Sequence, residues 1–229
     1  MTSRARTRQL SEPTISRLPI YQRIVEGWAA RGQRRIDSRQ IAEMAGVTAT
    51  TVRRDLAALG SLGTRGAGYE PAVLAERIGE ALGHDLHYDV IVVGLGNLGR
   101  ALVNSSNFLI RGAHLAGLYD VDPHVLGTEV AGLVVADARG ELMSATLGVI
   151  CVPGPAAQEV ADRLVAAGVR GILNFAPQVL SVPLGTAVHY VDFSIELQIL
   201  AFHLTNGTGP LGGVLHSVGL ATTGPGPGA

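Results

Sequence analysis

The residues with the clearest chemical meaning are three glycines that follow a short apolar run. The segment 88–93 (YDVIVV) leads into Gly94, and Gly96 and Gly99 complete the spacing G-x-G-x-x-G. A strand that runs into this spacing is typical of the turn that holds the pyrophosphate of a dinucleotide. Gly94 permits the tight turn, Gly96 lets backbone N–H groups approach the phosphates, and Gly99 lets the next helix pack closely. That helix would begin at Asn97 and direct its positive end toward the ligand.

A carboxylate at the end of the next expected strand strengthens this interpretation. Residues 114–119 are followed by Asp120, at about the expected distance beyond the glycines. A carboxylate there accepts hydrogen bonds from both ribose hydroxyls and repels a 2′-phosphate. The pattern therefore favours NAD(H) over NADP(H). The alternative is that Asp120 is an ordinary turn aspartate at the end of a strand and does not bind a ribose.

The rest of this region alternates between apolar strands and an amphipathic helix, which indicates a parallel sheet. The expected strands cover residues 90–93, 114–119, 149–152, 171–175 and 188–191, and the helix covers 156–167. Loops at the carboxyl ends of such strands line the ligand site, so Pro153 joins the expected contacts. Cys151 lies inside an apolar strand and is expected in the core.

A helix-turn-helix pattern precedes this domain. After a first helix over residues 20–30, Ser38 can cap a short helix, Gly46 permits a tight turn, and Val47 fills the corner. Thr48 can then cap a second helix. The spacing of small and apolar residues is that of a DNA-binding helix-turn-helix.

The second helix would present polar side chains to DNA. Its apolar residues share the inner face, and Thr50, Arg53 and Arg54 face outward. Arginine can form forked hydrogen bonds with guanine or bind phosphates, and threonine hydroxyls can contact either. A solvated arginine pair on an ordinary helical hairpin is the alternative.

A glycine-rich segment, residues 60–69, follows this helix and is expected to form a wing. Such a turn can approach a phosphate backbone or enter a minor groove. The contacts expected from it are Ser61, Thr64, Arg65 and Gly66. One more amphipathic helix over residues 71–83 closes the domain.

The charge distribution agrees with a polyanionic partner at one end. Residues 1–83 carry thirteen arginines against eight acidic residues, whereas residues 84–229 carry five against eleven. The chain contains no lysine. This excludes catalytic sites that depend on one, such as Tyr-x-x-x-Lys reductase sites and Schiff-base chemistry.

Composition excludes other classes of protein. Hydrophobic residues make up 47% of the chain, which indicates a globular protein. No apolar run approaches the ~20 residues that cross a bilayer, and no signal peptide is evident. A single cysteine fits the reducing cytoplasm, and the scattered histidines give no zinc spacing. We therefore expect a cytoplasmic protein without a membrane partner or a metal site.

The two ends of the chain differ in character. Residues 1–13 form a basic segment that is expected to be a flexible arm, and residues 207–229 are rich in glycine, proline and threonine and are expected to be disordered. Between them, residues 192–206 predict a helix capped by Asp192. This helix is apolar nearly all round and must be buried on most sides, against a partner subunit or against its own sheet.

In this order, these segments resemble the Rex family of redox-sensing transcriptional repressors. The resemblance spans residues 15–205. It rests on residues 52–56 (VRRDL), 60–69 (GSLGTRGAGY), 93–99 (VGLGNLG), 119–123 (YDVDP), 171–177 (GILNFAP) and 191–193 (VDF).

The resemblance implies an α/β chain that has an N-terminal winged helix-turn-helix domain, a Rossmann-like parallel-sheet domain and a C-terminal domain-swapped dimerisation helix. With the patterns above, the expected divisions are a basic arm (1–13), a DNA-binding domain (14–83), an NAD(H)-binding domain (84–191), the dimerisation helix (192–206) and a tail (207–229).

The resemblance also implies a mechanism. A homodimer would bind an inverted-repeat operator when NADH is scarce, and NADH would rotate the subunits and release the DNA. Phe193 would reach the partner's nicotinamide, and Arg23 and Asp192 match a pair whose contacts switch. Ser105 stands where the family usually has a tyrosine that competes for this aspartate, and serine is too short to reach as far. The expected NAD(H) contacts are Gly94, Leu95, Gly96, Asn97, Leu98, Gly99, Asp120, Pro153 and Phe193.

Two other functions are alternatives to a repressor. A small NAD-dependent dehydrogenase needs a general acid or base over the nicotinamide, and no histidine lies in a recognisable catalytic context. A CoA-binding module would place the phosphate of the CoA ribose near Asp120, which would repel it. We therefore expect a repressor and not an enzyme.

Overall fold

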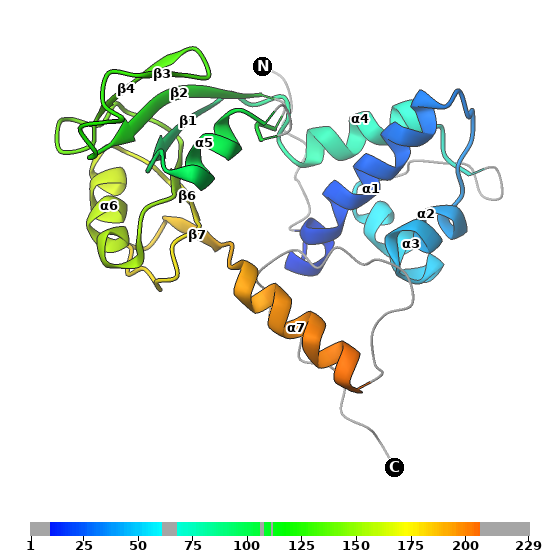
Figure 1. Cartoon of the computed structure of the whole chain (residues 1–229). Coiled ribbons are helices and arrows are strands. Elements are labelled where there is room, and N and C mark those ends of the chain that lie inside the picture. The colour runs from blue at the N-terminus through cyan, green and yellow to red at the C-terminus, as the bar shows by residue number, and fades with distance from the viewer. Residues whose placement is uncertain (1–9, 61–67, 106–107, 111, 207–229) are drawn as a thin grey trace. The chain divides into compact units, whose positions relative to one another are not determined.

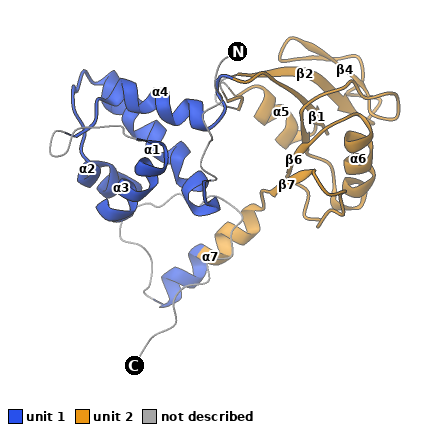
Figure 2. Cartoon of the chain, turned by 180° about the vertical axis from the view of Figure 1, so that it is seen from behind, with its two compact units in different colours: residues 1–85, 200–217 blue, residues 86–199, 218–229 orange. Residues whose placement is uncertain are grey.

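The computed structural model describes residues 10–60, 68–105, 108–110 and 112–206. The chain divides into two compact units, residues 1–85 with 200–217 and residues 86–199 with 218–229, and Figure 2 colours the units separately. The first of these boundaries lies between Asp85 and Leu86. The sequence patterns placed this boundary before His84. In the structure the backbone N–H of His84 donates to the Gly79 carbonyl at 2.9 Å, so this residue belongs to the turn that ends the helix formed by residues 71–81.

The first unit begins with a long helix, α1 (Glu12–Ala30). Ser11 caps it by accepting a hydrogen bond from a backbone N–H of the first turn at 3.4 Å. The predictions that this helix starts at Ile20 and that residues 11–13 belong to a flexible arm are therefore wrong. Pro19 lies inside the helix, and packing of the inner face on both sides of it outweighs the hydrogen bond that proline removes. The arm residues 1–9 lie outside the described part of the chain.

The predicted helix-turn-helix is confirmed by α2 (Ser38–Ala45) and α3 (Ala49–Ala58). Gly46 ends α2 in the left-handed conformation, with a φ of 67°. Thr48 caps α3 by accepting a hydrogen bond from a backbone N–H at 3.1 Å. The two helices are therefore joined as the residue types require (Figure 1).

The cap of α2 differs from the prediction, because Asp37 provides it and Ser38 does not. The Asp37 carboxylate accepts from the N–H groups of Arg39 and Gln40 at 2.7 and 2.9 Å. The Gln40 side chain in turn accepts from the Asp37 N–H at 2.8 Å. This reciprocal capping box satisfies more backbone groups than a serine one position later would.

The base of the predicted wing is an antiparallel bridge between Ile36 and Tyr69, whose backbones exchange hydrogen bonds of 3.0 and 2.7 Å. A β-carbon on Gly68 would lie 2.8 Å from the Ile36 carbonyl oxygen, so the close approach requires glycine. The chain then enters α4 (Pro71–Ala81), which contacts α1. The predicted wing contacts Ser61, Thr64, Arg65 and Gly66 lie outside the described residues.

The second unit is built on one seven-stranded sheet with the order β3-β4-β2-β1-β5-β6-β7. Every neighbouring pair is parallel except β3 with β4, which confirms the expected parallel sheet. The strands are β1 (Tyr88–Val93), β2 (Ala113–Asp120), β3 (Glu129–Val130), β4 (Leu133–Asp137), β5 (Leu147–Ile150), β6 (Gly171–Asn174) and β7 (Ala187–Tyr190). No apolar run in the sequence predicted β3 and β4, because most of their residues are exposed.

Alternate residues of β1 belong to two different cores. Val90 and Val92 pack in a cluster that includes Val103 of α5 (Asn97–Val103). Ile91 and Val93 pack in another that includes three residues of α6 (Gly154–Ala166). Since side chains of a strand alternate between its two faces, the two helices cover opposite sides of the sheet (Figure 1).

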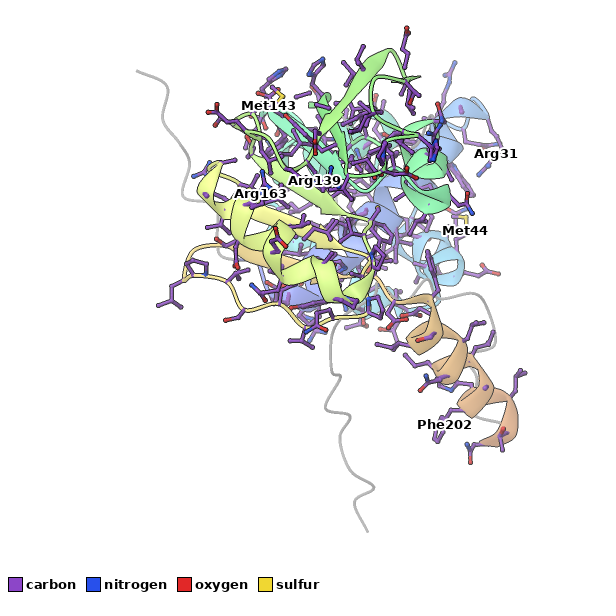
Figure 3. All side chains as sticks on the ribbon, turned by 60° about the vertical axis from the view of Figure 1, so that its left-hand side comes forward. Arg31, Met44, Arg139, Met143, Arg163 and Phe202 are labelled. Carbon is purple, nitrogen blue, oxygen red and sulfur yellow. The ribbon has the colours of Figure 1, made fainter. Side chains whose placement is uncertain are left out.

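The last helix, α7 (Phe193–Asn206), follows β7. Asp192 caps it as predicted, because its carboxylate accepts the Ser194 N–H at 2.8 Å. No side chain of α7 is buried, and Phe202, which is 62% exposed, projects from the helix (Figure 3). This overturns the alternative that the helix packs on its own sheet. The expected tail, 207–229, lies outside the described residues.

None of the helices formed by the described residues combines the length and the apolar character needed to span a membrane.

Candidate functional site

A pocket of about 310 Å³ lies at the carboxyl ends of β1, β2 and β5. The sheet order reverses between β1 and β5, and ligands of open α/β sheets bind at such a switch point. Four of the predicted contacts line this pocket, namely Gly94, Gly96, Asp120 and Pro153. The structure therefore brings the glycine turn and the predicted ribose acceptor together.

The Asp120 carboxylate is held in one orientation by backbone donors. One of its oxygens accepts from the N–H of Leu95 at 2.5 Å, and the other accepts from Val121 and Asp122 at 2.7 and 2.9 Å. A carboxylate offers about four lone-pair sites, so one site remains for a ligand hydroxyl. The side chain is positioned before any ligand arrives.

The three glycines have separate roles. Gly94 has a φ of 99°, and a β-carbon there would lie 2.6 Å from the Cys151 backbone. A β-carbon on Gly99 would collide with the Gly94 carbonyl. In contrast, a β-carbon on Gly96 would meet no atom of the described chain within 4 Å. Gly94 and Gly99 are therefore required by the fold, whereas Gly96 leaves space on the side of the pocket.

The other predicted contacts do not line the pocket. The Leu95 side chain is buried in the core, and its N–H already donates to Asp120. Phe193 lies with its ring centroid 6.4 Å from that of Phe175. The predicted contacts outside the pocket lining are Leu95, Asn97, Leu98, Gly99 and Phe193.

Two arginines on the pocket wall were missed by the sequence analysis (Figure 3). Arg139 follows β4, donates to the Val121 carbonyl at 3.0 Å and lies 3.5 Å from Asp137. Arg163 belongs to α6 and donates to the Gly140 carbonyl. These two cations accompany Asp120 in the pocket lining and can attract the phosphates of a dinucleotide. The loop that carries Arg139 follows β4, whose residues are mostly exposed and show no clear apolar pattern, so no signal in the sequence indicated this arginine.

Cys151 lies just after β5 and lines the pocket, which corrects its expected place inside a strand. Burial raises the pKa of its thiol to about 12. The thiol is therefore protonated at neutral pH and is a poor nucleophile. Among the described residues no group of three or more His, Cys, Asp or Glu side chains could hold a metal ion.

The outward face of α3 agrees with the predicted DNA-reading face. Val52 and Leu56 are buried, whereas Thr50, Arg53 and Arg54 are exposed. The Arg53 guanidinium donates to the hydroxyl of Ser38 at 3.2 Å and to that of Thr50 at 3.1 Å. This arginine is therefore oriented by both helices of the motif.

The sequence analysis missed Asp55, a buried acid on the same helix that is 1% exposed. Arg17 of α1 donates to both of its oxygens, at 2.7 and 2.9 Å, and the hydroxyls of Thr14 and Tyr21 donate at 3.0 and 2.9 Å. Burial alone would raise the pKa of Asp55, but these hydrogen bonds and the Arg17 charge lower its pKa below the usual value. Asp55 is therefore an ionised carboxylate with two hydrogen bonds to each oxygen.

Two family models match this chain, one in each of these regions. Residues 9–57 match the family model of a putative DNA-binding protein N-terminus, and residues 85–178 match that of a CoA binding domain. The redox-sensing transcriptional repressor Rex of Streptomyces griseus is 48% identical over 86% of this chain and 80% of its own length. Rex of Rhodopirellula baltica is 42% identical over 88% and 87%.

The chain belongs to the Rex family. Solved structures agree with this assignment. The crystal structure of RSP in complex with β-NAD⁺ and operator DNA has a TM-score of 0.78, at 35% identity, over 87% of this chain and 94% of that chain. RSP in complex with β-NADH has a TM-score of 0.74, at 34% identity, over 87% and 96%. RSP is a Rex-family repressor.

The pair expected to switch in a Rex protein consists of Arg23 and Asp192, which lie in different units of the chain. Arg23 is exposed on α1, and the Asp192 carboxylate accepts from the N–H and hydroxyl of Ser194 at 2.8 and 2.6 Å. These hydrogen bonds lower the pKa of Asp192. Ser105 follows α5, and its backbone N–H donates to the Leu102 carbonyl at 2.9 Å. The pairing of Arg23 with Asp192 stays a prediction.

Proposed function

We propose that this chain is a redox-sensing transcriptional repressor that binds operator DNA as a homodimer and releases it when NADH occupies its Rossmann-like domain. The observation that carries this function is the combination, in one Rex-family chain, of a helix-turn-helix with exposed arginines and a pocket that joins a glycine turn to a fixed carboxylate. Transcriptional repression, and not catalysis, is the function of the family to which the chain belongs.

The pocket supports NAD(H) as its ligand. The pyrophosphate would lie against Gly96, where the chain leaves open space, and one ribose hydroxyl would donate to the acceptor site that remains on Asp120. A phosphate on this ribose would be repelled by the carboxylate, which disfavours both NADP(H) and CoA. The match to a CoA binding domain therefore agrees with the fold, while Asp120 argues for a different ligand.

The DNA-binding roles follow from the geometry of α3. Thr50, Arg53 and Arg54 would enter the major groove, where arginine forks match guanine and phosphate oxygens. The wing contacts Ser61, Thr64, Arg65 and Gly66 remain part of this proposal. In a homodimer the two recognition helices fit an inverted repeat whose half-sites lie ~34 Å apart or at a multiple of that spacing.

Coupling between the two sites would run through the dimer. α7 exposes apolar side chains along its whole length, which supports its assignment as the exchanged dimerisation helix. Phe193 at its start would reach the partner's nicotinamide, and Arg23 and Asp192 would change contacts. NADH must bind more tightly to the released conformation, because a ligand shifts an equilibrium only by its differential affinity. A repressor of this kind acts in the cytoplasm, where the operator lies.

The test is the fluorescence anisotropy of a labelled inverted-repeat operator with the full chain, titrated separately with NADH, NAD⁺ and CoA. We expect NADH to release the DNA at concentrations at which NAD⁺ largely spares the complex and CoA has no effect. Operator binding that neither NADH nor NAD⁺ changes would refute redox sensing, but it would still support a DNA-binding repressor. Release by CoA at lower concentrations than by NADH would refute the assigned ligand.

A further inference from the structure

A buried acid lies beside the DNA-reading arginines of α3. Asp55 directly follows Arg53 and Arg54, and the structure places Asp55, Arg54 and Arg17 around the same hollow. Opposite charges attract each other more strongly where water is partly excluded. An ionised carboxylate with free lone pairs at this position would therefore draw the Arg54 guanidinium away from DNA.

Asp55 has no free lone pair. Arg17 donates twice, at 2.7 and 2.9 Å, and Thr14 and Tyr21 donate once each, so each oxygen accepts two hydrogen bonds. A carboxylate has about four acceptor sites, and all are used. Accordingly, Arg54 is exposed and forms no hydrogen bond or ion pair with any other described residue.

All three donors to Asp55 lie on α1. Arg17 supplies the positive charge among them, and its side chain is 23% exposed against 1% for Asp55. The forked contact of a guanidinium with both carboxylate oxygens is the strongest arrangement available to such a pair. Arg17, which lies on the helix before the helix-turn-helix, is thus the residue that neutralises the charge of Asp55.

We propose that Arg17 is a positioning residue for operator binding: by saturating Asp55 it leaves the Arg54 guanidinium available to the DNA. This inference rests on the proposed function, since it assumes that the exposed face of α3 binds an operator. It differs from a simple structural role, in which the network would only hold α1 against α3. In that case Arg17 and Arg54 would affect DNA binding independently.

A double-mutant cycle on the full-length protein separates the two roles. Arg54→Gln alone should weaken operator binding by roughly tenfold, and Arg17→Gln alone by a similar factor. If Asp55 captures Arg54 once Arg17 is gone, Arg54→Gln should have less than about a twofold further effect in the Arg17→Gln background. Adding Asp55→Asn to Arg17→Gln should restore both the affinity and the tenfold sensitivity to Arg54→Gln.

The salt dependence of binding gives an independent readout. The slope of log affinity against log salt falls by about one for each lost contact between a cation and a phosphate. Arg17→Gln should therefore reduce this slope by about two in a dimer, although Arg17 is not on the exposed face of α3. Loss of stability alone would leave the slope unchanged, as long as the domain is folded.

Folding of each variant is checked in the same samples. Trp28, the single tryptophan of the chain, lies in α1 and reports unfolding of the first unit. NADH binding reports whether the second unit is folded. If Arg17→Gln is unfolded at the assay temperature, Tyr21→Phe is used in its place in the double-mutant cycle. This variant removes one hydrogen-bond donor to Asp55, so the expected losses of operator affinity have the same sign and are smaller.

Two results would overturn the inference. One is additive effects of Arg17→Gln and Arg54→Gln with an unchanged salt slope. The other is wild-type operator affinity in a folded Arg17→Gln variant. Failure of the wild-type chain to bind any operator would instead refute the proposed function, so the two failures are distinguishable.

Discussion

The carboxylate of Asp120 accepts a hydrogen bond from the backbone N–H of Leu95 at 2.5 Å, which ties the end of β2 to the glycine turn after β1. The residue assigned to the ribose is thus also part of the turn assigned to the pyrophosphate. A change at this position therefore alters the shape of the site together with its charge.

Asp120→Asn changes both together. An asparagine oxygen can still accept from Leu95, but the amide NH2 cannot accept from Val121 and Asp122, and the negative charge that repels a ribose phosphate is lost. We expect NADH to bind roughly tenfold more weakly, because a hydrogen bond to a charged group contributes about 1.5–3 kcal/mol. NADPH should gain affinity relative to NADH. Nucleotide titrations of operator release measure both, and operator affinity without nucleotide is the control. An unchanged preference for NADH over NADPH would contradict the assignment.

Gly99→Ala and Gly96→Ala form a matched pair. The added methyl group collides with the Gly94 carbonyl in the first variant, whereas it meets no atom of the described chain within 4 Å in the second. Overpacking of this kind costs about 1–3 kcal/mol or more, so Gly99→Ala should lower the thermal stability of the second unit. Gly96→Ala should keep that stability and lose NADH affinity. Differential scanning calorimetry and NADH titration test the pair, and equal NADH affinity for Gly96→Ala and wild type would count against a pyrophosphate at Gly96.

Leu197→Glu in α7 should weaken the dimer. Leu197 is 67% exposed in the single chain, and a charge there would be buried without a partner in an apolar interface. We expect monomers at concentrations at which the wild type is dimeric, together with loss of operator binding. Sedimentation velocity measures the first and anisotropy the second. Gln198→Glu adds the same charge to a neighbouring polar position and serves as the control. A dimeric Leu197→Glu variant would exclude this face of α7 from the interface.

The stability of the first unit should depend on pH through Asp55. Its pKa is lower in the folded protein than its ordinary value of about 3.9, so the unfolded chain binds the proton more readily. The stabilisation is therefore complete above about pH 5 and is lost as the pH falls through the folded pKa. Asp55→Asn should be destabilised at pH 7 by about 1.5–3 kcal/mol, the size of a hydrogen bond to a charged group, since it leaves Arg17 without its ionised partner. Its stability should then change less than that of the wild type between pH 7 and pH 3.

Urea unfolding followed by Trp28 fluorescence measures these stabilities in the full chain, because this tryptophan lies in the first unit. Glu80→Gln is a suitable control, since its ion pair with Arg77 is exposed and contributes little. Parallel pH profiles for wild type and Asp55→Asn would show that another group governs acid unfolding.

Local chemistry predicted the parts of the structure that depend on neighbouring residues. Gly46 and Thr48 define the turn and the cap between two helices, and Gly94 and Gly99 define the turn after β1. These requirements act within a few positions of the chain. They are therefore visible as spacing in the sequence.

The features that the sequence analysis missed depend on distant contacts. Asp55 is a charged residue among buried positions, and its main partner Arg17 lies 38 positions earlier. The early start of α1 depends on packing that compensates for Pro19. Arg139 reaches the pocket on a loop after β4, a strand whose side chains are mostly exposed. The spacing of residues within one segment cannot predict contacts between residues that lie far apart in the sequence.

Cys151 gives the pocket a further property. Peroxides and disulfides react with thiolates, and a thiol with a pKa of about 12 supplies almost none at neutral pH. A repressor with this single cysteine would be insulated from oxidants that react with thiolates, and it would respond to the redox state of its bound nucleotide instead. Oxidation of a cysteine and reduction of the bound nucleotide are then distinct inputs, and the proposed repressor responds to the second.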